Sequence, residues 1–246
     1  MNLAIVIPTY NESKNIIFLI QGIFSILENT KDVHTHLYIV DDSSPDNTSG
    51  IALSLSKQFN RDNFDITVFN RSKKEGLGAA YIDAISRLNN SVIKFDYILQ
   101  MDADLSHNPA YIPIFLEKAK DNFDFVIGSR YVKGGDTPDW IWYRKLISLL
   151  GNFYARIMLD SRITDYTGGF NLDASYLLNS DTLSKVNTNG YGFLISLKYF
   201  CAKNSKNLCQ IPIIFTDRRM GVSKMPVSTF LNNFILVLKI RLDRTK

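Results

Sequence analysis

Short apolar runs and segments with a helical repeat alternate along the first half of the chain. The runs contain four or five residues and show little alternation with polar ones, which is typical of strands buried on both faces. We expect strands at residues 3–7, 37–40, 66–69, 97–101 and 125–128. The segments between them predict helices at residues 16–27, 51–59, 77–88 and 109–120. This alternation predicts an α/β domain with a doubly wound, mostly parallel sheet.

Charged side chains directly follow three of these predicted strands. They are Asp41 and Asp42 after the second strand, Asp102 and Asp104 after the fourth, and Arg130 after the fifth. Ligands bind beyond the carboxyl ends of parallel strands, so we expect one crevice to collect these residues. In extended backbone, residues two apart face the same way, and the carboxylates of the D-x-D triplet would converge. Hard oxygen ligands of this kind suit Mg²⁺ or Mn²⁺ bound to a diphosphate.

The hydrophobic pattern is less regular in the second half of the chain. Trp140, Trp142 and Tyr143 lie in a segment bounded by Gly and Pro and followed by two basic residues. This segment predicts either a lid or membrane-facing patch, or a loop packed by its own aromatic rings. Further along we expect a helix at residues 146–158, a backbone close to a ligand in the Gly-rich segment 164–170, and a strand at residues 210–215.

The last 21 residues, 226–246, combine apolar positions at helical spacing with basic residues toward the end. We expect an amphipathic, basic helix there, attached to a domain at residues 1–225. The apolar stretch is too short to cross a bilayer. The helix would either dock on the domain or lie on a membrane or a partner subunit.

Composition and charge limit the class of protein. With 246 residues, of which 46% are hydrophobic, the chain can form one well-filled core. The net charge is +4, but residues 203–246 contain nine Lys or Arg against two Asp, so an anionic partner is expected near this end. No nucleic-acid-binding module accompanies that charge, so no nucleic acid is expected as a partner. Cys201 and Cys209 have no zinc-site spacing and no signal peptide is recognisable, so we expect a cytoplasmic protein.

Seven motifs follow one another across residues 3–224: I-P-T-Y-N-E (7–12), V-D-D-S-S-P-D (40–46), G-L-G-A-A-Y (76–81), M-D-A-D-L-S-H (101–107), G-S-R-Y (128–131), W-Y-R-K-L-I-S (142–148) and G-x-S-K (221–224). Together they resemble the family 2 inverting glycosyltransferases, and within them the polyprenyl-phosphate (dolichyl-phosphate) mannose synthases. The first two motifs mark the wider family, and the last four are more specific. The resemblance implies a GT-A-type nucleotide-diphospho-sugar transferase fold, with the catalytic domain at residues 1–225.

The resemblance also implies which residues bind the donor. The nucleoside of GDP-mannose would be held by Pro8, Tyr10, Glu12, Asp41 and Asp42. A Mg²⁺ or Mn²⁺ ion would be held by Asp102 and Asp104. Family members can have a metal-binding Gln two positions after the second Asp of the motif. This chain has Ser106 there, which leaves the third protein ligand open.

A second set of residues would act on the phosphates and the acceptor. Arg130 would contact the donor phosphates or the sugar. Arg144 and Ser148 would bind the acceptor phosphate. Arg218 and Lys224 would clamp the site from a loop that closes over it.

The function implied is transfer of mannose, with inversion, from GDP-mannose to a polyprenyl phosphate. The acceptor phosphate is already anionic at neutral pH, so no general base is required, and the three histidines, His34, His36 and His107, are not arranged as a triad. Another nucleotide sugar such as UDP-glucose remains an alternative donor, and a non-catalytic subunit that binds a lipid phosphate is an alternative of another class. We expect a peripheral location on the cytoplasmic face of a membrane, reached directly or through a membrane-anchoring subunit.

Overall fold

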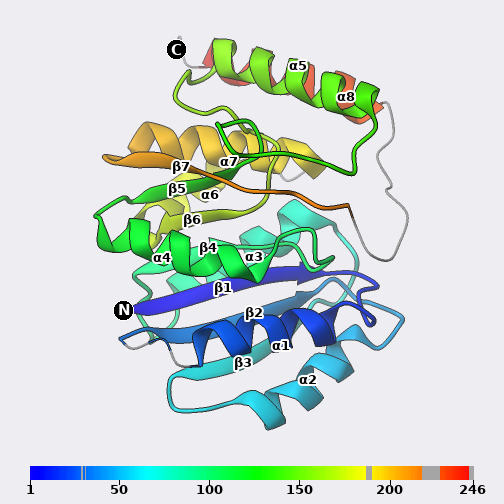
Figure 1. Ribbon diagram of the computed structural model, residues 1–246, viewed down its shortest axis with the longest axis vertical. Coiled ribbons are helices and arrows are strands. Elements are labelled where there is room, and N and C mark those ends of the chain that lie inside the picture. Colours follow the sequence, from blue (N-terminus) through cyan, green and yellow to red (C-terminus); the bar gives the residue numbers. More distant parts are fainter. Residues whose placement is uncertain (29, 31, 187–189, 218–227, 244–246) are drawn as a thin grey trace.

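A seven-stranded sheet forms the centre of the protein in the computed structural model (Figure 1). The structure describes residues 1–28, 30, 32–186, 190–217 and 228–243. Five strands fall on the predicted apolar runs, with ends that shift by up to three residues: β1 (Asn2–Thr9), β2 (His34–Asp41), β3 (Phe64–Asn70), β4 (Tyr97–Gln100) and β5 (Phe125–Ser129). Two more complete the sheet, β6 (Asn171–Ala174) and β7 (Leu208–Pro212), the latter starting and ending earlier than predicted.

The strands follow the order β3-β2-β1-β4-β6-β5-β7. All neighbours are parallel except at β6, which runs antiparallel to both β4 and β5. The predicted mostly parallel sheet is therefore confirmed. The sequence did not predict β6, because Asn171 and Asp173 interrupt its apolar pattern. Since β6 is reversed, the chain that enters it lies at the same edge as the carboxyl ends of β4 and β5.

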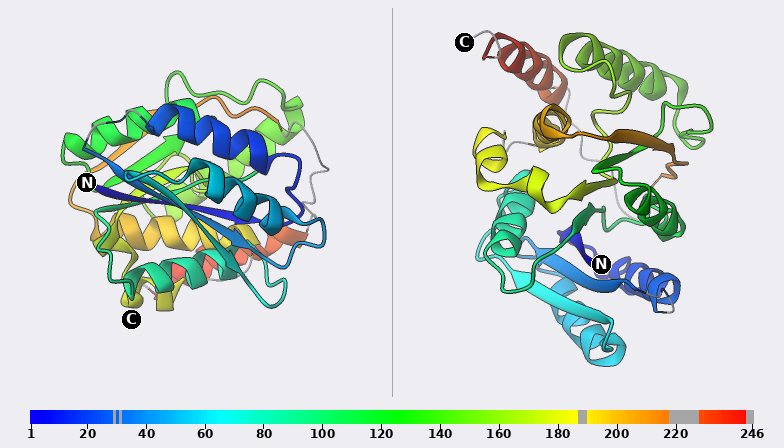
Figure 2. Two further views of the ribbon diagram at one scale, coloured as in Figure 1. Left: turned by 90° about the horizontal axis from the view of Figure 1, so that it is seen from below. Right: turned by 90° about the vertical axis from the view of Figure 1, so that its left-hand side faces the viewer.

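Helices cover both faces of this sheet (Figure 2). The side chains of β1 alternate between the faces, so that Leu3, Ile5 and Ile7 belong to one buried cluster and Ala4 and Val6 to the other. The first cluster is closed by α1 (Ile16–Leu27), α2 (Thr48–Phe59) and α4 (Ile112–Lys120), which follows the short 3-10 helix η1 (Pro109–Tyr111). Burial on both faces explains why the strands contain so few polar residues.

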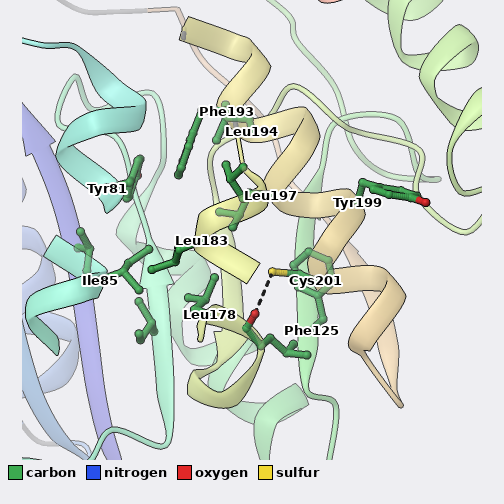
Figure 3. Close-up of a cluster of buried hydrophobic side chains, with 14 of the residues drawn as sticks. Tyr81, Ile85, Phe125, Leu178, Leu183, Phe193, Leu194, Leu197, Tyr199 and Cys201 are labelled. Carbon is green, nitrogen blue, oxygen red and sulfur yellow. Dashed lines mark hydrogen bonds between the residues drawn. The ribbon is translucent and has the colours of Figure 1, made fainter. Parts of the chain in front are cut away.

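The second cluster lies mainly under α3 (Leu77–Asn89) and α7 (Gly190–Asn204), with η2 (Ser175–Leu178) and α6 (Ser180–Lys185) beside them. Figure 3 shows Tyr81 of α3 next to Phe193 of α7, with ring centroids 5.3 Å apart and planes 5° from parallel. The helices α6 and α7 were not predicted from the sequence. The buried residues of α7 pack into the second cluster, and α6 packs against α7.

Two helices form an outer layer beyond β7, α5 (Trp142–Met158) and α8 (Ser228–Asp243) (Figures 1 and 2). The helix α5 begins four residues before the predicted start, so the aromatic segment runs into it. The terminal helix docks on α7 and α5, since Val237 and Ile240 are buried and the ring of Phe234 stacks on Tyr154 at 4.3 Å. In the part of the chain that the structure describes, no helix is both long and apolar enough to cross a membrane.

Candidate active site

The first acidic residue after β2, Asp41, is buried and fixed by three hydrogen bonds. Its carboxylate accepts the hydroxyl of Thr9 at the end of β1 (2.9 Å) and both the hydroxyl (2.6 Å) and the main-chain N–H of Ser44 (2.8 Å). The neighbouring strands β1 and β2 are thus joined at their carboxyl ends. The orientation of this side chain is set before any ligand arrives.

Asp42 holds the loop between β3 and α3. Its carboxylate pairs with Arg71 and accepts the main-chain N–H groups of Glu75 (3.1 Å) and Gly76 (2.7 Å). Gly76 has a φ of +92°, a conformation that side chains rarely adopt, at the point where α3 begins. These bonds show that Asp41 and Asp42 shape the carboxyl edge of the sheet. Direct contact of the two aspartates with a nucleoside stays a prediction.

The remaining residues predicted to hold the nucleoside lie in or just after β1. Pro8 is part of β1 and pairs with Val40 of β2. The ring of Tyr10 lies 3.5 Å from the Nζ of Lys74, which comes from the loop before α3. Glu12 accepts a hydrogen bond from the Asn15 side chain (2.7 Å). The structure thus brings this part of the predicted site together around the carboxyl ends of β1 and β2.

The two aspartates of the D-x-D motif follow β4 and differ in exposure. Asp104 is buried, with only 5% of its surface exposed, whereas 33% of the Asp102 side chain is exposed. Ser106 donates its hydroxyl (2.5 Å) and its main-chain N–H (3.1 Å) to the same Asp104 oxygen. Ser106 thereby orients one carboxylate of the motif.

The chemistry of this donor set fits a metal that is bound together with a nucleotide. Within the described ranges, no group of three or more His, Cys, Asp or Glu residues is placed to hold a metal ion. Two carboxylates alone suit Mg²⁺ or Mn²⁺, which commonly takes its other ligands from substrate phosphates and water. Asp102 and Asp104 are the residues that would hold the ion.

Arg130 follows β5 and is nearly buried in a set of polar and aromatic partners. Its guanidinium donates to both oxygens of Asp165 (2.6 and 2.7 Å) and to the hydroxyl of Thr167 (2.8 Å). Trp140 and Phe215 lie beside it, with ring centroids 5.3 and 5.4 Å from Cζ. Burial opposes the ionisation of Asp165, but Arg130 outweighs it and holds the pKa of that carboxyl well below its ordinary value.

The Gly-rich segment 164–170 lies between the D-x-D motif and Arg130. The main-chain oxygen of Phe170 accepts the N–H of Gly128 in β5 (2.8 Å). A Cβ on Gly169 would lie only 3.2 Å from a carboxylate oxygen of Asp102. The structure shows a close approach of this backbone to the D-x-D motif, and the predicted approach to a ligand stays a prediction.

Arg144 and Ser148 lie on α5, on the side that faces the sheet. Arg144 donates to both oxygens of Asp217 (3.1 Å each), and its guanidinium lies 4.0 Å from the ring centroid of Trp140. The hydroxyl of Ser148 accepts that of Tyr131 from the G-S-R-Y motif (2.6 Å). The side chains of Arg144 and Asp217 are 34% and 43% exposed. An ion pair this exposed contributes at most about 1 kcal/mol to the stability of the fold. An incoming anion can therefore compete with Asp217 for Arg144.

The opposite side of α5 is apolar and open to solvent. Its large apolar residues are between 46% and 75% exposed: Trp142, Leu146, Leu149, Leu150, Phe153 and Ile157. On α8, Phe234, Ile235 and Leu242 are exposed by 50% to 64%. Of the predicted aromatic segment, Trp140 is packed inward whereas Trp142 and Tyr143 are exposed, and a lid or membrane contact of the exposed rings stays a prediction. We call the exposed apolar residues of α5 and α8 the apolar platform.

Two predicted site residues, Arg218 and Lys224, lie outside the described residues. Sequence reasoning missed three residues that the structure places at the site, Lys74, Asp165 and His107. Asp165 occurs in a Gly-rich segment that was singled out for its backbone alone, and His107 ends the D-A-D-L-S-H motif. Lys74 has no sequence feature that would have identified it.

A doubly wound sheet with a D-x-D motif at its carboxyl edge is the arrangement found in glycosyltransferases of the GT-A type. The chain belongs to glycosyl transferase family 2, whose model matches residues 4–177. It is 34% identical to the polyprenol monophosphomannose synthase of Mycolicibacterium smegmatis over 98% of this chain and 89% of that protein. It is 35% identical to the undecaprenyl-phosphate mannosyltransferase of Micrococcus luteus over 92% of this chain and 88% of that protein.

Solved structures share the fold at low sequence identity. Glucosyl-3-phosphoglycerate synthase from Mycobacterium tuberculosis in complex with UDP superimposes with a TM-score of 0.65, 17% identity and coverage of 99% of this chain and 79% of that chain. Its complex with Mn²⁺, UDP and glucosyl-3-phosphoglycerate gives a TM-score of 0.63 at 16% identity, with coverage of 98% of this chain and 79% of that chain. At this identity the likeness shows the GT-A-like fold.

Proposed function

We propose that the protein transfers mannose, with inversion, from GDP-mannose to a polyprenyl phosphate at a membrane surface, with Mg²⁺ or Mn²⁺ as cofactor. The names of two relatives at 34% and 35% identity support the sugar and the acceptor. The Mn²⁺ and UDP in a structural neighbour support a divalent metal and a nucleotide-sugar donor. The guanine base of the donor is supported by the motif resemblance.

One observation carries the proposal: an Arg–Ser pair suited to a phosphate and an exposed apolar surface occur on the same helix. Arg144 and Ser148 face the sheet from one side of α5, and the apolar platform occupies the other side. A polyprenyl phosphate has the same two parts, an anionic head and a long apolar chain. Its phosphate would replace Asp217 on Arg144 while its chain stays with the apolar residues.

The donor would bind at the carboxyl ends of β1, β2 and β4. The bonds around Asp41 and Asp42 shape the nucleoside end, with Pro8, Tyr10 and Glu12 beside it. Asp102 and Asp104 would hold the ion, which would neutralise charge on the departing diphosphate. Arg130, oriented by Asp165, would contact the donor phosphates or the sugar through its guanidinium.

The reaction itself is a single displacement. An oxygen of the acceptor phosphate forms a bond to the anomeric carbon of mannose as the bond from that carbon to the GDP oxygen breaks, which inverts the configuration. The attacking oxygen is already anionic, so no group has to remove a proton. The residues would act by positioning two anions that repel each other and by stabilising the leaving diphosphate.

The apolar platform also supports peripheral contact with a membrane. Trp142 and Tyr143 are exposed at the start of α5, and such aromatics favour the interface between water and lipid. The helix α5 contains three basic residues and no acidic one, which suits an anionic lipid surface. A membrane-anchoring subunit bound to the apolar platform would also hold the protein at a membrane.

The experiment is transfer of radiolabelled sugar from GDP-mannose, and in parallel from UDP-glucose, into organic-extractable polyprenyl phosphate, with Mn²⁺ and with a chelator. We expect metal-dependent label from GDP-mannose. Label from UDP-glucose alone would replace the donor. No label from either donor would favour the non-catalytic lipid-phosphate-binding subunit.

A further inference from the structure

His107, the last residue of the D-A-D-L-S-H motif, is buried beneath the two aspartates. Only 1% of its surface is exposed. Its ring stacks on Phe170, with centroids 4.9 Å apart and planes 13° from parallel, and meets Phe215 edge-on at 5.6 Å. A side chain so enclosed does not reach a substrate. Its influence on the site has to pass through the residues that it contacts.

One ring nitrogen of His107 fixes the main chain of a metal-binding residue. Nδ1 accepts the main-chain N–H of Asp102 at 3.0 Å. A nitrogen that accepts carries no proton, so the neutral ring has its hydrogen on Nε2. The bond spans five residues and closes the loop that contains both aspartates.

The other ring nitrogen is buried without a hydrogen-bond partner in the described part of the chain. It lies 3.8 Å from a carboxylate oxygen of Asp102, just beyond hydrogen-bond distance. Gly169 lies against both residues, since a Cβ there would lie 3.2 Å from Asp102 Oδ1 and 3.4 Å from Cε1 of the His107 ring. Nε2–H is therefore a buried donor whose nearest acidic group is the carboxylate of the D-x-D motif that is exposed.

We infer that His107 is a positioning residue for the metal site, which fixes the main chain of Asp102 through Nδ1 and places Nε2–H beside the carboxylate of the same residue. This inference rests on the proposed metal-dependent function. It assigns a supporting role to a histidine in a site whose third protein ligand the sequence leaves open. Groups that orient a metal ligand from behind typically change metal affinity about 10- to 100-fold when they are removed.

The test compares two substitutions at this position with one control at another histidine. His107→Phe keeps the ring that stacks on Phe170 but removes both nitrogens, His107→Asn keeps an acceptor near the place of Nδ1, and His36→Phe is the control. His36 is also a partly buried histidine next to a phenylalanine, but it lies on β2 beside Asp65 and Phe95. Binding of Mn²⁺ in the presence of GDP is measured by the loss of the free-ion EPR signal, and the Tm of each variant is recorded.

We expect His107→Phe to weaken Mn²⁺ binding about tenfold or more, His107→Asn to recover part of that loss, and His36→Phe to have no effect. Asp104→Asn serves as the reference for the site itself. Weak Mn²⁺ binding in Asp104→Asn together with unchanged binding in His107→Phe would overturn the role of His107 alone. Unchanged binding in both would overturn the metal site and the proposed function with it.

A spectroscopic measurement keeps the inference testable if the Phe variant folds poorly. In protein labelled with ¹⁵N-histidine, only three side chains contribute, and His107 is the one that disappears in either variant at position 107. We expect its spectrum to show a proton on Nε2 alone, and the Nε2 resonance to shift when Mg²⁺ and GDP are added. A proton on Nδ1, or a resonance that ignores the metal, would contradict the inference.

Discussion

The edge of the sheet that we assign to the donor and the helix that we assign to the acceptor are built in opposite ways. At the sheet edge, Asp41 and Asp104 are buried and bonded to neighbouring main-chain and hydroxyl groups. On α5, Arg144 is partly exposed and its ion-pair partner Asp217 is exposed too, and the large apolar residues on the other side of the helix are 46% to 75% exposed. The donor edge is organised by the chain itself, whereas the side that we assign to the acceptor leaves apolar surface exposed for a proposed partner.

This difference teaches where binding energy would act. A preorganised edge loses little entropy when a nucleotide and a metal bind, since its side chains are already fixed. The platform on α5 and α8 exposes large apolar residues at a cost that contact with lipid would remove. Substitutions on the two sides should therefore have different consequences.

The largest effect is expected at the donor edge. Asp104→Asn keeps the shape of the side chain and an acceptor for Ser106, but it removes the charge that would bind the metal. We expect transfer of mannose to fall at least about 10³-fold. Asp121→Asn, an exposed aspartate at the end of α4, is the control. Full metal-dependent activity in Asp104→Asn would contradict the assignment of this edge of the sheet to the donor and its metal.

The next effect separates the acceptor from the donor. Arg144→Ala removes a charged donor that we assign to the acceptor phosphate, so the KM for polyprenyl phosphate should rise about 10- to 100-fold. Binding of GDP with Mn²⁺, measured by calorimetry, should not change. Arg156→Ala lies on the same helix and serves as the control. A loss of GDP binding in Arg144→Ala would place this residue on the donor side instead.

A smaller effect is expected from the apolar platform. Leu150→Ser with Phe153→Ser removes two exposed apolar side chains, so partitioning to vesicles with anionic lipid should fall about tenfold while the Tm stays the same. The matched control is Phe18→Ser with Leu53→Ser, which changes the same residue types on α1 and α2, exposed by 59% and 45%. An equal loss of vesicle binding in the two double variants would show that α5 is not the membrane-binding surface.

The smallest effect concerns the buried support behind the donor edge. Asp173 on β6 is buried, and burial raises its pKa to about 7, although Gln100 donates a hydrogen bond to it (2.7 Å). Because the folded pKa lies above the unfolded one, the folded state binds the proton more tightly, and this residue lowers the stability as pH rises from about 4 to about 7.

Asp173→Asn removes that dependence. The variant should gain stability relative to the natural protein as pH rises from 5 to 8, on the order of 1 kcal/mol or a few degrees in Tm. Asp181→Asn, an exposed aspartate on α6, should show no such trend. A constant difference in Tm across this pH range would mean that Asp173 is ionised in the folded protein.

The sequence predicted the donor edge better than the acceptor side, for a physical reason. The strands β1 to β5 are continuous apolar runs, and their acids follow them directly, so local pattern is enough to place Asp41 and Asp104 at one edge. The strand β6 is short and polar, and its place between β4 and β5 depends on contacts distant in sequence. The Arg130–Asp165 pair joins a residue after β5 to one before β6, 35 positions apart in the sequence, so no local pattern reveals it.

The exposed face of α5 was equally hard to foresee. Its apolar residues occur at helical spacing, which usually means a face turned toward the core. Here the core side is occupied by Arg144, Ser148, Asn152 and Ala155, and the apolar side faces outward. The position of α5 beyond the edge strand β7 determines that its polar side faces the domain and its apolar side faces solvent.

The most direct test of the central claim compares a lipid acceptor with a soluble one. Radiolabelled GDP-mannose and Mn²⁺ are supplied with polyprenyl phosphate in vesicles, or with 3-phosphoglycerate in solution, the acceptor type in the name of the structural neighbour. If α5 brings a lipid phosphate to the donor edge, label should enter the lipid and not 3-phosphoglycerate. Label in 3-phosphoglycerate with none in the lipid would contradict the account.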